Sequence, residues 1–353
     1  MALTGLSPEE LAGALPDLPP FRAKQIFRWI ARGALSFGEM TDLSRELRED
    51  LAARHTLYGS DVAGVLEDPD GTVKLQLRLA DGAMIEAALL RDDRGRQTAC
   101  LSTQAGCPVG CVFCKTGSLG FLRNLAAHEI VEQFLSLRRI APSIANVVVM
   151  GMGEPLLNLA ELRKAMGIIT HNEGLGLSKR RITLSTSGVI PGIRDMTDAG
   201  PDLRLAVSLA AADQTLREEL MPIAAANPLP ALKDALLRYQ ERRGRRITLE
   251  AVLLGGVNTR DEDIEGIAAF ARGLDAAVNL IPWNPVAGLS FRGRPLREPT
   301  GAEIARFSRE LARRGLAVTR RRRKGRSVSA ACGQLGALPL SPVQAGGNKQ
   351  EEF

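Results

Sequence analysis

The sequence predicts an α/β fold, namely a partial barrel of about six βα units, preceded by a small helical unit and a β-hairpin extension. Three observations predict it. Apolar strand-like runs alternate with longer amphipathic segments from residue 98 to residue 325, which is typical of a parallel sheet. About six or seven such units fall short of the eight that close a barrel. Polar segments follow several strands, where ligands bind in such folds. The strand candidates are TACLS, NVVVMG, RITLSTS, LRLAVSLA, ITLEAVLL, AVNLIPW and LAVTR.

Residues 1–55 are expected to form the helical unit. The segment FRAKQIFRWIARG has helical periodicity, and its apolar side is assigned to Phe21, Ile26, Phe27 and Ile30. A second amphipathic segment, TDLSRELREDLAARH, predicts a helix capped by Thr41 or Asp42.

Residues 56–95 are expected to form the extension, because the hydrophobic period there changes to two. The run TVKLQLRLADGAMIEAALL alternates around Asp81 and Gly82, a dipeptide that favours a tight hairpin turn. We expect the barrel core over residues 96–338 and a disordered tail over residues 339–353. One core helix is predicted from AAHEIVEQFLSLRRI, with an apolar face of Ala127, Ile130, Val131, Phe134 and Leu135.

Composition places the chain among globular proteins. Of its 353 residues, 45% are hydrophobic and 24% are charged, and no apolar run approaches the roughly 18 residues that span a bilayer. Five cysteines are an odd and low number for this length, which disfavours a secreted disulfide framework. We therefore expect a cytoplasmic protein without a membrane partner, acting as a monomer.

The charge favours a polyanionic partner. The net charge is +6 and the pI is about 9.3, and arginines cluster in the runs 242–246 and 320–324. We expect both runs to contact phosphate groups. Aromatic residues make up only 4% of the chain, which argues against a surface of base-stacking rings.

The segment AGCPVGCVFCKTG holds three cysteines, Cys107, Cys111 and Cys114, in the spacing C-x3-C-x2-C. Three thiolates this close can converge on one centre. Structural zinc needs four ligands, and the fourth is not evident in this segment. A cube of four irons held by three thiolates leaves one iron open to bind and activate a ligand. Three packed thiols without a metal remain the alternative.

This motif, placed after a first strand, resembles the signature of the radical S-adenosylmethionine (SAM) enzymes, in which the open iron is chelated by SAM. Four later segments are similar to SAM-binding segments of that superfamily: GMGEP, STSG, SLA and NLIPWNP. The resemblance implies one [4Fe–4S] cluster bound by the three cysteines. It also implies SAM contacts at Gly153, Glu154, Ser185, Ser208, Leu209, Ala210 and Asn284.

The narrower resemblance is to the RlmN/Cfr family of radical SAM methyltransferases, which methylate adenosine in RNA. It covers nearly the whole chain and includes FRAKQIFRWI, EMTDLS, CLSTQAGC, KRRITLSTSG, IPWNP and AACGQL. It implies methylation at C2 of an adenosine in 23S rRNA, and of an adenosine in tRNA, with an electron donor such as flavodoxin or ferredoxin. Methylation at adenine C8, the Cfr-type reaction, is the alternative, because it uses the same five cysteines.

The resemblance also implies roles for the other two cysteines. Adenine C2 is an sp2 carbon without a nucleophilic lone pair, so direct displacement on the SAM methyl group is not available. In the family, the cysteine of AACGQL, here Cys332, carries the methyl group, and two SAM molecules are used per turnover. Cys100 corresponds to the cysteine that resolves the protein–RNA adduct through a transient disulfide. Glu86 corresponds to the proton acceptor.

The chain departs from the family pattern in two places. Ala210 stands where the family usually has histidine, so any side-chain contact to SAM is lost there. The residues before AACGQL are GRSVS rather than acidic, which makes the approach to Cys332 more basic. A function of another class, a zinc-stabilised RNA-binding module without catalysis, leaves GMGEP, Cys100 and Cys332 without a role.

Overall fold

A single ten-stranded sheet organises the molecule, and the computed structural model describes residues 2–336. The strand order is β1-β2-β3-β4-β7-β8-β9-β10-β11-β14. The last seven are parallel and correspond to the seven strand candidates: β4 (Gln97–Cys100), β7 (Ile144–Val149), β8 (Ile182–Thr186), β9 (Arg204–Ser208), β10 (Ile247–Leu253), β11 (Ala276–Pro282) and β14 (Ala317–Arg320). The predicted partial barrel is confirmed.

The extension forms as part of the same sheet. Its strands are antiparallel: β1 (Ser60–Glu67), β2 (Val73–Leu79) and β3 (Met84–Arg91). The predicted turn joins β2 to β3, and Gly82 has a φ of +84°, which only glycine adopts without strain. Because β3 also pairs with β4, the extension continues the barrel sheet. With β1 it has three strands rather than the two of the predicted hairpin.

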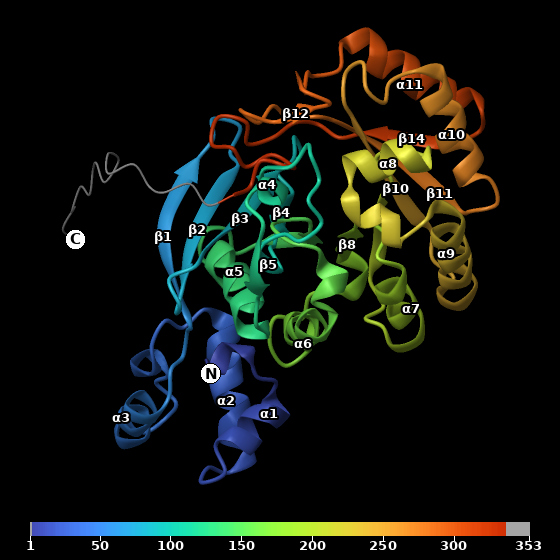
Figure 1. Ribbon diagram of the computed structural model, residues 1–353. Helices are drawn as coiled ribbons and strands as arrows, with labels where there is room; N and C mark the ends of the chain where they lie inside the picture. The colour runs from blue at the N-terminus through green and yellow to red at the C-terminus, as the bar shows by residue number, and fades with distance from the viewer. Residues whose placement is uncertain (1, 337–353) are drawn as a thin grey trace.

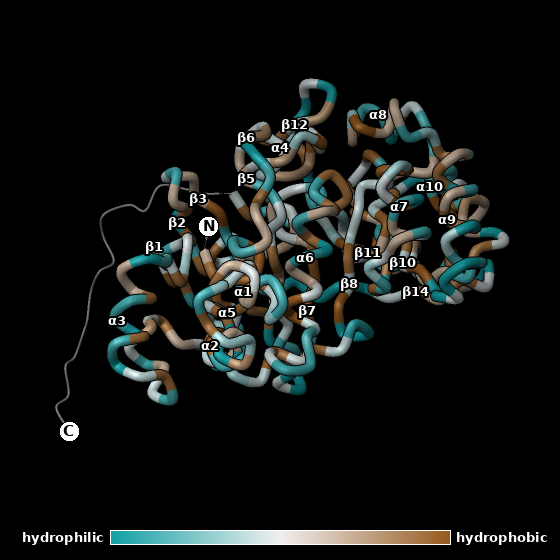
Figure 2. The backbone as a smooth tube through the Cα atoms, turned by 90° about the horizontal axis from the view of Figure 1, so that it is seen from below, coloured by the Kyte–Doolittle hydropathy of each residue, from teal (hydrophilic) through white to brown (hydrophobic). Residues whose placement is uncertain are grey.

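Helices cover the outer face of the parallel strands, as Figure 1 shows. They are α5 (Ala127–Ile140), α6 (Leu159–Thr170), α7 (Ile190–Ala199), α9 (Leu229–Arg243), α10 (Asp261–Ala271) and α11 (Gly301–Arg313). The apolar face predicted for residues 126–140 is buried in α5. Figure 2 shows hydrophobic colour concentrated on the strands and hydrophilic colour on the outer turns. None of the helices within residues 2–336 is both long and apolar enough to cross a bilayer.

The N-terminal unit contains η1 (Leu3–Gly5), α1 (Pro8–Ala14), α2 (Pro20–Arg32), η2 (Phe37–Glu39) and α3 (Arg45–Arg54). Helix α2 buries Ile26, Phe27 and Ile30, each stabilising the fold by about 1.5–3 kcal/mol. Phe21 is instead 55% exposed, with the Arg22 guanidinium 4.9 Å from its ring centre. Five helical residues turn about 140°, so Phe21 belongs to the opposite face and its assignment to the apolar side is wrong.

The predicted cap of the next helix is also wrong. Helix α3 begins at Arg45, and the Ser44 hydroxyl accepts from the Leu47 amide. Asp42 has a different partner, because its carboxylate accepts from the indole of Trp29 at 2.6 Å. Asp42 therefore accepts a tertiary hydrogen bond and does not cap the helix.

The N-terminal unit is joined to the core through Glu132, which is buried on α5. Its carboxylate accepts from the Thr4 hydroxyl at 2.6 Å, the Gly59 amide at 2.8 Å and the Ser60 hydroxyl at 2.5 Å. These donors come from η1 and from the start of the extension. One core side chain thus holds two preceding parts of the chain.

After β14 the chain crosses back to the antiparallel strands (Figure 1). We call residues 325–336 the C-terminal segment. The Gly325 amide donates to Asp70 at 2.8 Å, the Ser327 amide donates to Asp68 at 2.8 Å, and the Gly336 amide donates to Glu86 at 2.9 Å. The tail predicted over residues 339–353 lies outside the described residues.

Candidate active site

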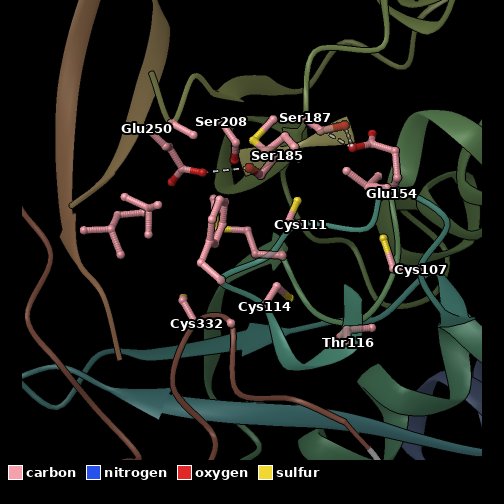
Figure 3. Close-up of a pocket in the computed structure, with 18 of the residues that line it drawn as sticks. Cys107, Cys111, Cys114, Thr116, Glu154, Ser185, Ser187, Ser208, Glu250 and Cys332 are labelled. Carbon is pink, nitrogen blue, oxygen red and sulfur yellow. Dashed lines mark hydrogen bonds between the residues drawn. The ribbon is translucent and has the colours of Figure 1, made fainter. Parts of the chain in front are cut away.

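A cavity of about 170 Å³ lies at the carboxyl ends of the parallel strands (Figure 3). All three motif cysteines and Cys332 line it, together with side chains that follow successive strands. We call it the cysteine cavity. The residues used below are Cys107, Cys111, Cys114, Gly153, Glu154, Ser185, Ser208, Ala210, Glu250, Arg321 and Cys332.

The cysteine loop is held at both ends. It runs between β5 (Gln104–Gly106) and β6 (Phe121–Asn124), which pair with each other, and it contains the short helix α4 (Lys115–Ser118). The Val112 amide donates to the Leu220 carbonyl, and the Lys115 amide donates to the Gly333 carbonyl at 2.7 Å. The second of these bonds attaches the cysteine loop directly to the C-terminal segment.

The three motif cysteines fit an iron–sulfur cube better than a single ion. All five cysteines are free thiols, and within residues 2–336 no three acidic, His or Cys side chains are placed to hold one metal ion. In a cube each thiolate binds a different iron, so the sulfurs stand farther apart than ligands that share an ion. Burial raises the pKa of Cys107 to about 12 and raises those of Cys111 and Cys114. Metal binding to these thiols therefore releases protons.

Glu154 is buried at the turn after β7, and both of its carboxylate oxygens accept hydrogen bonds. One carboxylate oxygen accepts from the Leu156 amide at 3.0 Å, and the other accepts from the amide and hydroxyl of Ser187, both at 2.7 Å. Burial raises the pKa of Glu154. Gly153 has a φ of +100°, and a Cβ there would lie 2.6 Å from the Cβ of Gln104. Only glycine therefore lets this turn pass close to β5.

Ser185 is hydrogen-bonded to a carboxylate, Glu250, that was not predicted from the sequence. Its hydroxyl donates to Glu250 of β10 at 2.7 Å (Figure 3). Glu250 is 5% exposed, and the Arg321 guanidinium lies 3.9 Å from its other oxygen. A glutamate inside the apolar run ITLEAVLL was the available signal, because an isolated buried charge needs a partner.

The turn after β9 carries the other predicted SAM contacts. Ser208 and Ala210 line the cysteine cavity, whereas the Leu209 side chain is buried away from it, so only its backbone is near. The Leu209 amide donates to the Glu250 carbonyl at 2.9 Å. Ala210 has a φ of +55°, and its carbonyl accepts from the Asn258 amide group at 2.8 Å. The backbone of this turn is therefore fixed without a histidine.

A buried arginine holds two of these turns together. Arg217 of α8 (Gln214–Leu220) is fully buried, and its guanidinium donates to the carbonyls of Ser187, Leu209 and Asn227 at 2.6–3.2 Å. It has no carboxylate partner within the described part of the chain, and burial lowers its pKa to about 10. Sequence reasoning gave no signal for it, because the surrounding run QTLREEL has the composition of an exposed helix.

Cys332 also lines a second, smaller cavity of about 50 Å³, and Cys100 lies in its wall. We call it the thiol cavity. Cys332 and its expected partner, Cys100, therefore line the same cavity, although 232 positions separate them in the sequence. Burial, followed by the nearby Cys332, raises the pKa of Cys100 to about 12. Arg321 lines both cavities and supplies a positive charge beside the two thiols.

Asn284 lines the thiol cavity and shows where a further ligand fits. Its side chain is 4% exposed, and its amide group donates to the Cys332 carbonyl at 3.0 Å. Among residues 2–336 its buried Oδ1 atom has no hydrogen-bond partner. An orphaned buried acceptor beside the cysteine cavity fits a ligand that carries donors, as the adenosyl group of SAM does.

Glu86 lines neither cavity. It is fully buried on β3, where Lys74 lies 3.2 Å and the Gln76 amide 3.0 Å from one oxygen. Its other oxygen accepts from the Gly336 amide. The predicted proton acceptor therefore lies one hydrogen bond from the segment that carries Cys332.

The fold and the cysteine loop define a class of protein, the radical SAM enzymes. The Radical SAM superfamily model matches residues 101–271, and a model described as the ribosomal RNA large subunit methyltransferase N-terminal domain matches residues 2–57. A solved radical SAM methyltransferase from Sphaerobacter thermophilus has a TM-score of 0.90 and 40% sequence identity, covering 95% of this chain and 99% of that one.

Curated relatives narrow the class. A protein of Treponema denticola named "Probable dual-specificity RNA methyltransferase RlmN" is 50% identical over 336 residues, which are 95% of each chain. One from Thermus thermophilus with the same name is 41% identical over 98% of this chain and 97% of its own. The chain belongs to the RlmN family of radical SAM RNA methyltransferases, and this membership implies a [4Fe–4S] cluster and SAM.

Proposed function

We propose that this enzyme methylates C2 of an adenosine in 23S rRNA and of an adenosine in tRNA. The observation that carries the proposal is the shared position of Cys332, which lines both the cysteine cavity and the thiol cavity that contains Cys100. Relatives named dual-specificity RlmN support the two RNA substrates and do not favour the C8 reaction. An electron donor such as flavodoxin or ferredoxin supplies the reducing electron.

The chain's own residues divide the remaining work. Cys107, Cys111 and Cys114 hold the cluster, and the turns at Gly153–Glu154, Ser185 and Ser208–Ala210, with Asn284, hold SAM. When bound, the cluster and SAM supply the methyl group and the means of activating its C–H bond. Two SAM molecules are used per turnover. Cys332 carries the methyl group as S-methylcysteine and becomes linked to adenine through one carbon.

Release of the product is the task of Cys100. Its thiolate attacks the Cys332 sulfur and forms a disulfide, while the electrons of the broken S–C bond stay on the carbon. That carbon takes a proton and remains on the adenine as its methyl group, so the RNA separates from the protein. Glu86, one hydrogen bond from the C-terminal segment, accepts the proton lost from the adenine ring. The basic run 320–324, four members of which line the thiol cavity, contacts the RNA backbone there.

Mass spectrometry of nucleosides tests the proposal. Ribosomal RNA and tRNA from cells with and without this gene are digested, and 2-methyladenosine is separated from 8-methyladenosine. We expect 2-methyladenosine to disappear from both RNAs when the gene is deleted and to return with a plasmid copy. An 8-methyladenosine signal that follows the gene contradicts the C2 assignment, and an unchanged tRNA pool contradicts the second substrate.

A further inference from the structure

A third cavity, of about 810 Å³, opens beside the cysteine loop and is lined by four arginines. It lies between the start of α8, the loop from Gly255 to Arg260 after β10, and a small hairpin of β12 (Ser290–Phe291) and β13 (Arg294–Pro295). Figures 1 and 2 both place β12 near α4, the helix that follows Cys114. The arginines are Arg260, Arg292, Arg294 and Arg297.

Three of the arginines are oriented from behind by carboxylates. Arg260 pairs with Asp263, Arg292 with Glu219 and Arg297 with Glu303, all at 2.7–3.0 Å. The arginine side chains are 51–65% exposed, whereas Asp263 is 4% and Glu303 19% exposed. A guanidinium has five donors, and a carboxylate occupies two of them at most. The remaining donors are free to reach a ligand on the open side.

The fourth arginine has no such partner. Arg294 is exposed and forms no ion pair within residues 2–336. It stands on a hairpin whose turn residues, Arg292 and Gly293, have φ values of +48° and +73°. A positive φ is costly for arginine, and the Glu219 ion pair fixes Arg292 there. The hairpin is thus held in place and presents Arg294 outward.

The four arginines are continuous with the basic run beside Cys332. Arg297 donates to the Glu298 carbonyl, and the Glu298 carboxylate accepts from Arg323 at 2.6 Å and from Arg326 at 2.7 Å. Glu298 therefore connects this cavity to the thiol cavity along one edge of the molecule. The two groups thus present guanidinium donors along one edge of the molecule, an arrangement that suits the successive phosphates of an RNA backbone.

We propose that the cavity at the β12–β13 hairpin binds phosphates of the substrate RNA that flank the modified nucleotide. The proposal rests on the RNA substrate of the proposed function and adds a second contact region for it. The charge of the nearby carboxylates nearly balances that of the four arginines. Binding here therefore depends on directed hydrogen bonds to one or two phosphates rather than on long-range electrostatic attraction. The opposite arginine run, 242–246, lies at the amino end of β10, where Arg245 pairs with Asp202 and Arg246 with Asp275. That run faces away from both cavities.

Fluorescence anisotropy with a labelled RNA stem-loop tests the proposal. The loop contains an unpaired adenosine, and the RNA is used with its full stem and as the loop alone. For the stem-loop, we expect Arg294→Gln to weaken binding about threefold to tenfold and to reduce the salt slope by about one. Arg294→Glu is expected to weaken it further. The loop alone contains the phosphates that flank the adenosine, so its binding is expected to weaken by a similar factor.

Arg272→Gln is the matched control, because Arg272 is exposed directly after α10, at the amino ends of the strands, and lines none of the three cavities. Wild-type affinity and salt slope for Arg294→Gln on the stem-loop overturn the proposal. So does slower cluster reduction by flavodoxin in Arg294→Glu with unchanged RNA binding, because the surface then serves an acidic protein. Methylation by the wild-type chain is measured in parallel. If it succeeds while Arg294→Gln binds normally, only this inference fails, whereas a wild-type chain that neither binds nor methylates RNA overturns both.

Discussion

Cys100 and Cys332 line the same small cavity, and their removal should stop the reaction at different steps. In Cys332→Ala no S-methylcysteine forms and no RNA becomes attached, because the carrier sulfur is gone. In Cys100→Ala the attachment proceeds but release is blocked, so protein joined to RNA through Cys332 is expected to accumulate. Denaturing gels with nuclease treatment and mass spectrometry of the Cys332 peptide check both outcomes. RNA-free Cys100→Ala protein, or methylation by Cys332→Ala, contradicts the division of roles.

Release of the adduct is expected to depend strongly on pH. Burial raises the pKa of Cys100 to about 12, and the thiolate is the attacking form. Between pH 7 and pH 9 the thiolate fraction therefore rises about tenfold per pH unit, and the decay of the adduct in a quenched single turnover should rise with it. A flat profile over this range would show that another step limits release.

At the residue scale, local motifs were predictable and spatial partners were not. The spacing of Cys107, Cys111 and Cys114 is carried by eight consecutive positions, so it can be recognised without a structure. Glu250 lies on β10 and Arg321 directly follows β14, and only folding places them together. Glu86 was expected beside the site, and the structure shows why its surroundings could not be predicted: Lys74, Gln76 and the Gly336 amide surround its buried carboxylate, and Gly336 is distant in the sequence.

At the scale of elements, the cysteine loop depends on the close approach of its two ends. A Cβ on Gly106 would lie 2.0 Å from the Gly120 carbonyl oxygen, so Gly106→Ala must separate β5 from β6. We expect this variant to lose bound iron and about 2–4 kcal/mol of stability. Iron analysis after anaerobic reconstitution and chemical denaturation measure the two effects.

Gly120→Ala is the control for that variant. Gly120 also has a positive φ, +77°, but a Cβ there would meet nothing within 4 Å. It should therefore lose about 1 kcal/mol and keep its iron. Equal iron loss in both variants would mean that backbone strain, and not contact between the loop ends, controls the cluster site.

Strands were predictable because seven apolar runs alternate with longer helical patterns. Helix ends were less predictable, since capping depends on which side chains are left free by tertiary contacts. Asp42 was a reasonable cap by residue type, yet the indole of Trp29 occupies it and Ser44 caps α3 instead. The third strand of the extension, β1, was missed because its burial alternates weakly along the solvent-exposed edge of the sheet.

At the scale of the whole molecule, Glu132 connects the N-terminal unit and the extension to the core. Glu132→Ala leaves the Thr4 and Ser60 hydroxyls and the Gly59 amide without their acceptor, so the free energy of unfolding should fall by about 2–4 kcal/mol. Guanidinium denaturation measures the loss. Glu241→Ala, which removes an exposed glutamate of α9, is expected to change stability by less than about 0.5 kcal/mol. Equal effects of the two substitutions would contradict a connecting role for Glu132.

The C-terminal segment has a consequence for how deletions of this protein are interpreted. Strands β1 and β14 are the two ends of the described sheet, and residues 325–336 run from one end toward the other through Asp70, Asp68 and Glu86. The segment therefore joins the two ends of the open sheet, and it also carries Cys332, the proposed methyl carrier. A chain that stops before Gly325 should lose these hydrogen bonds and RNA methylation together, and it should unfold at a lower temperature. Cys332→Ser removes only the chemistry, so its thermal unfolding should coincide with that of the wild type while RNA methylation is abolished.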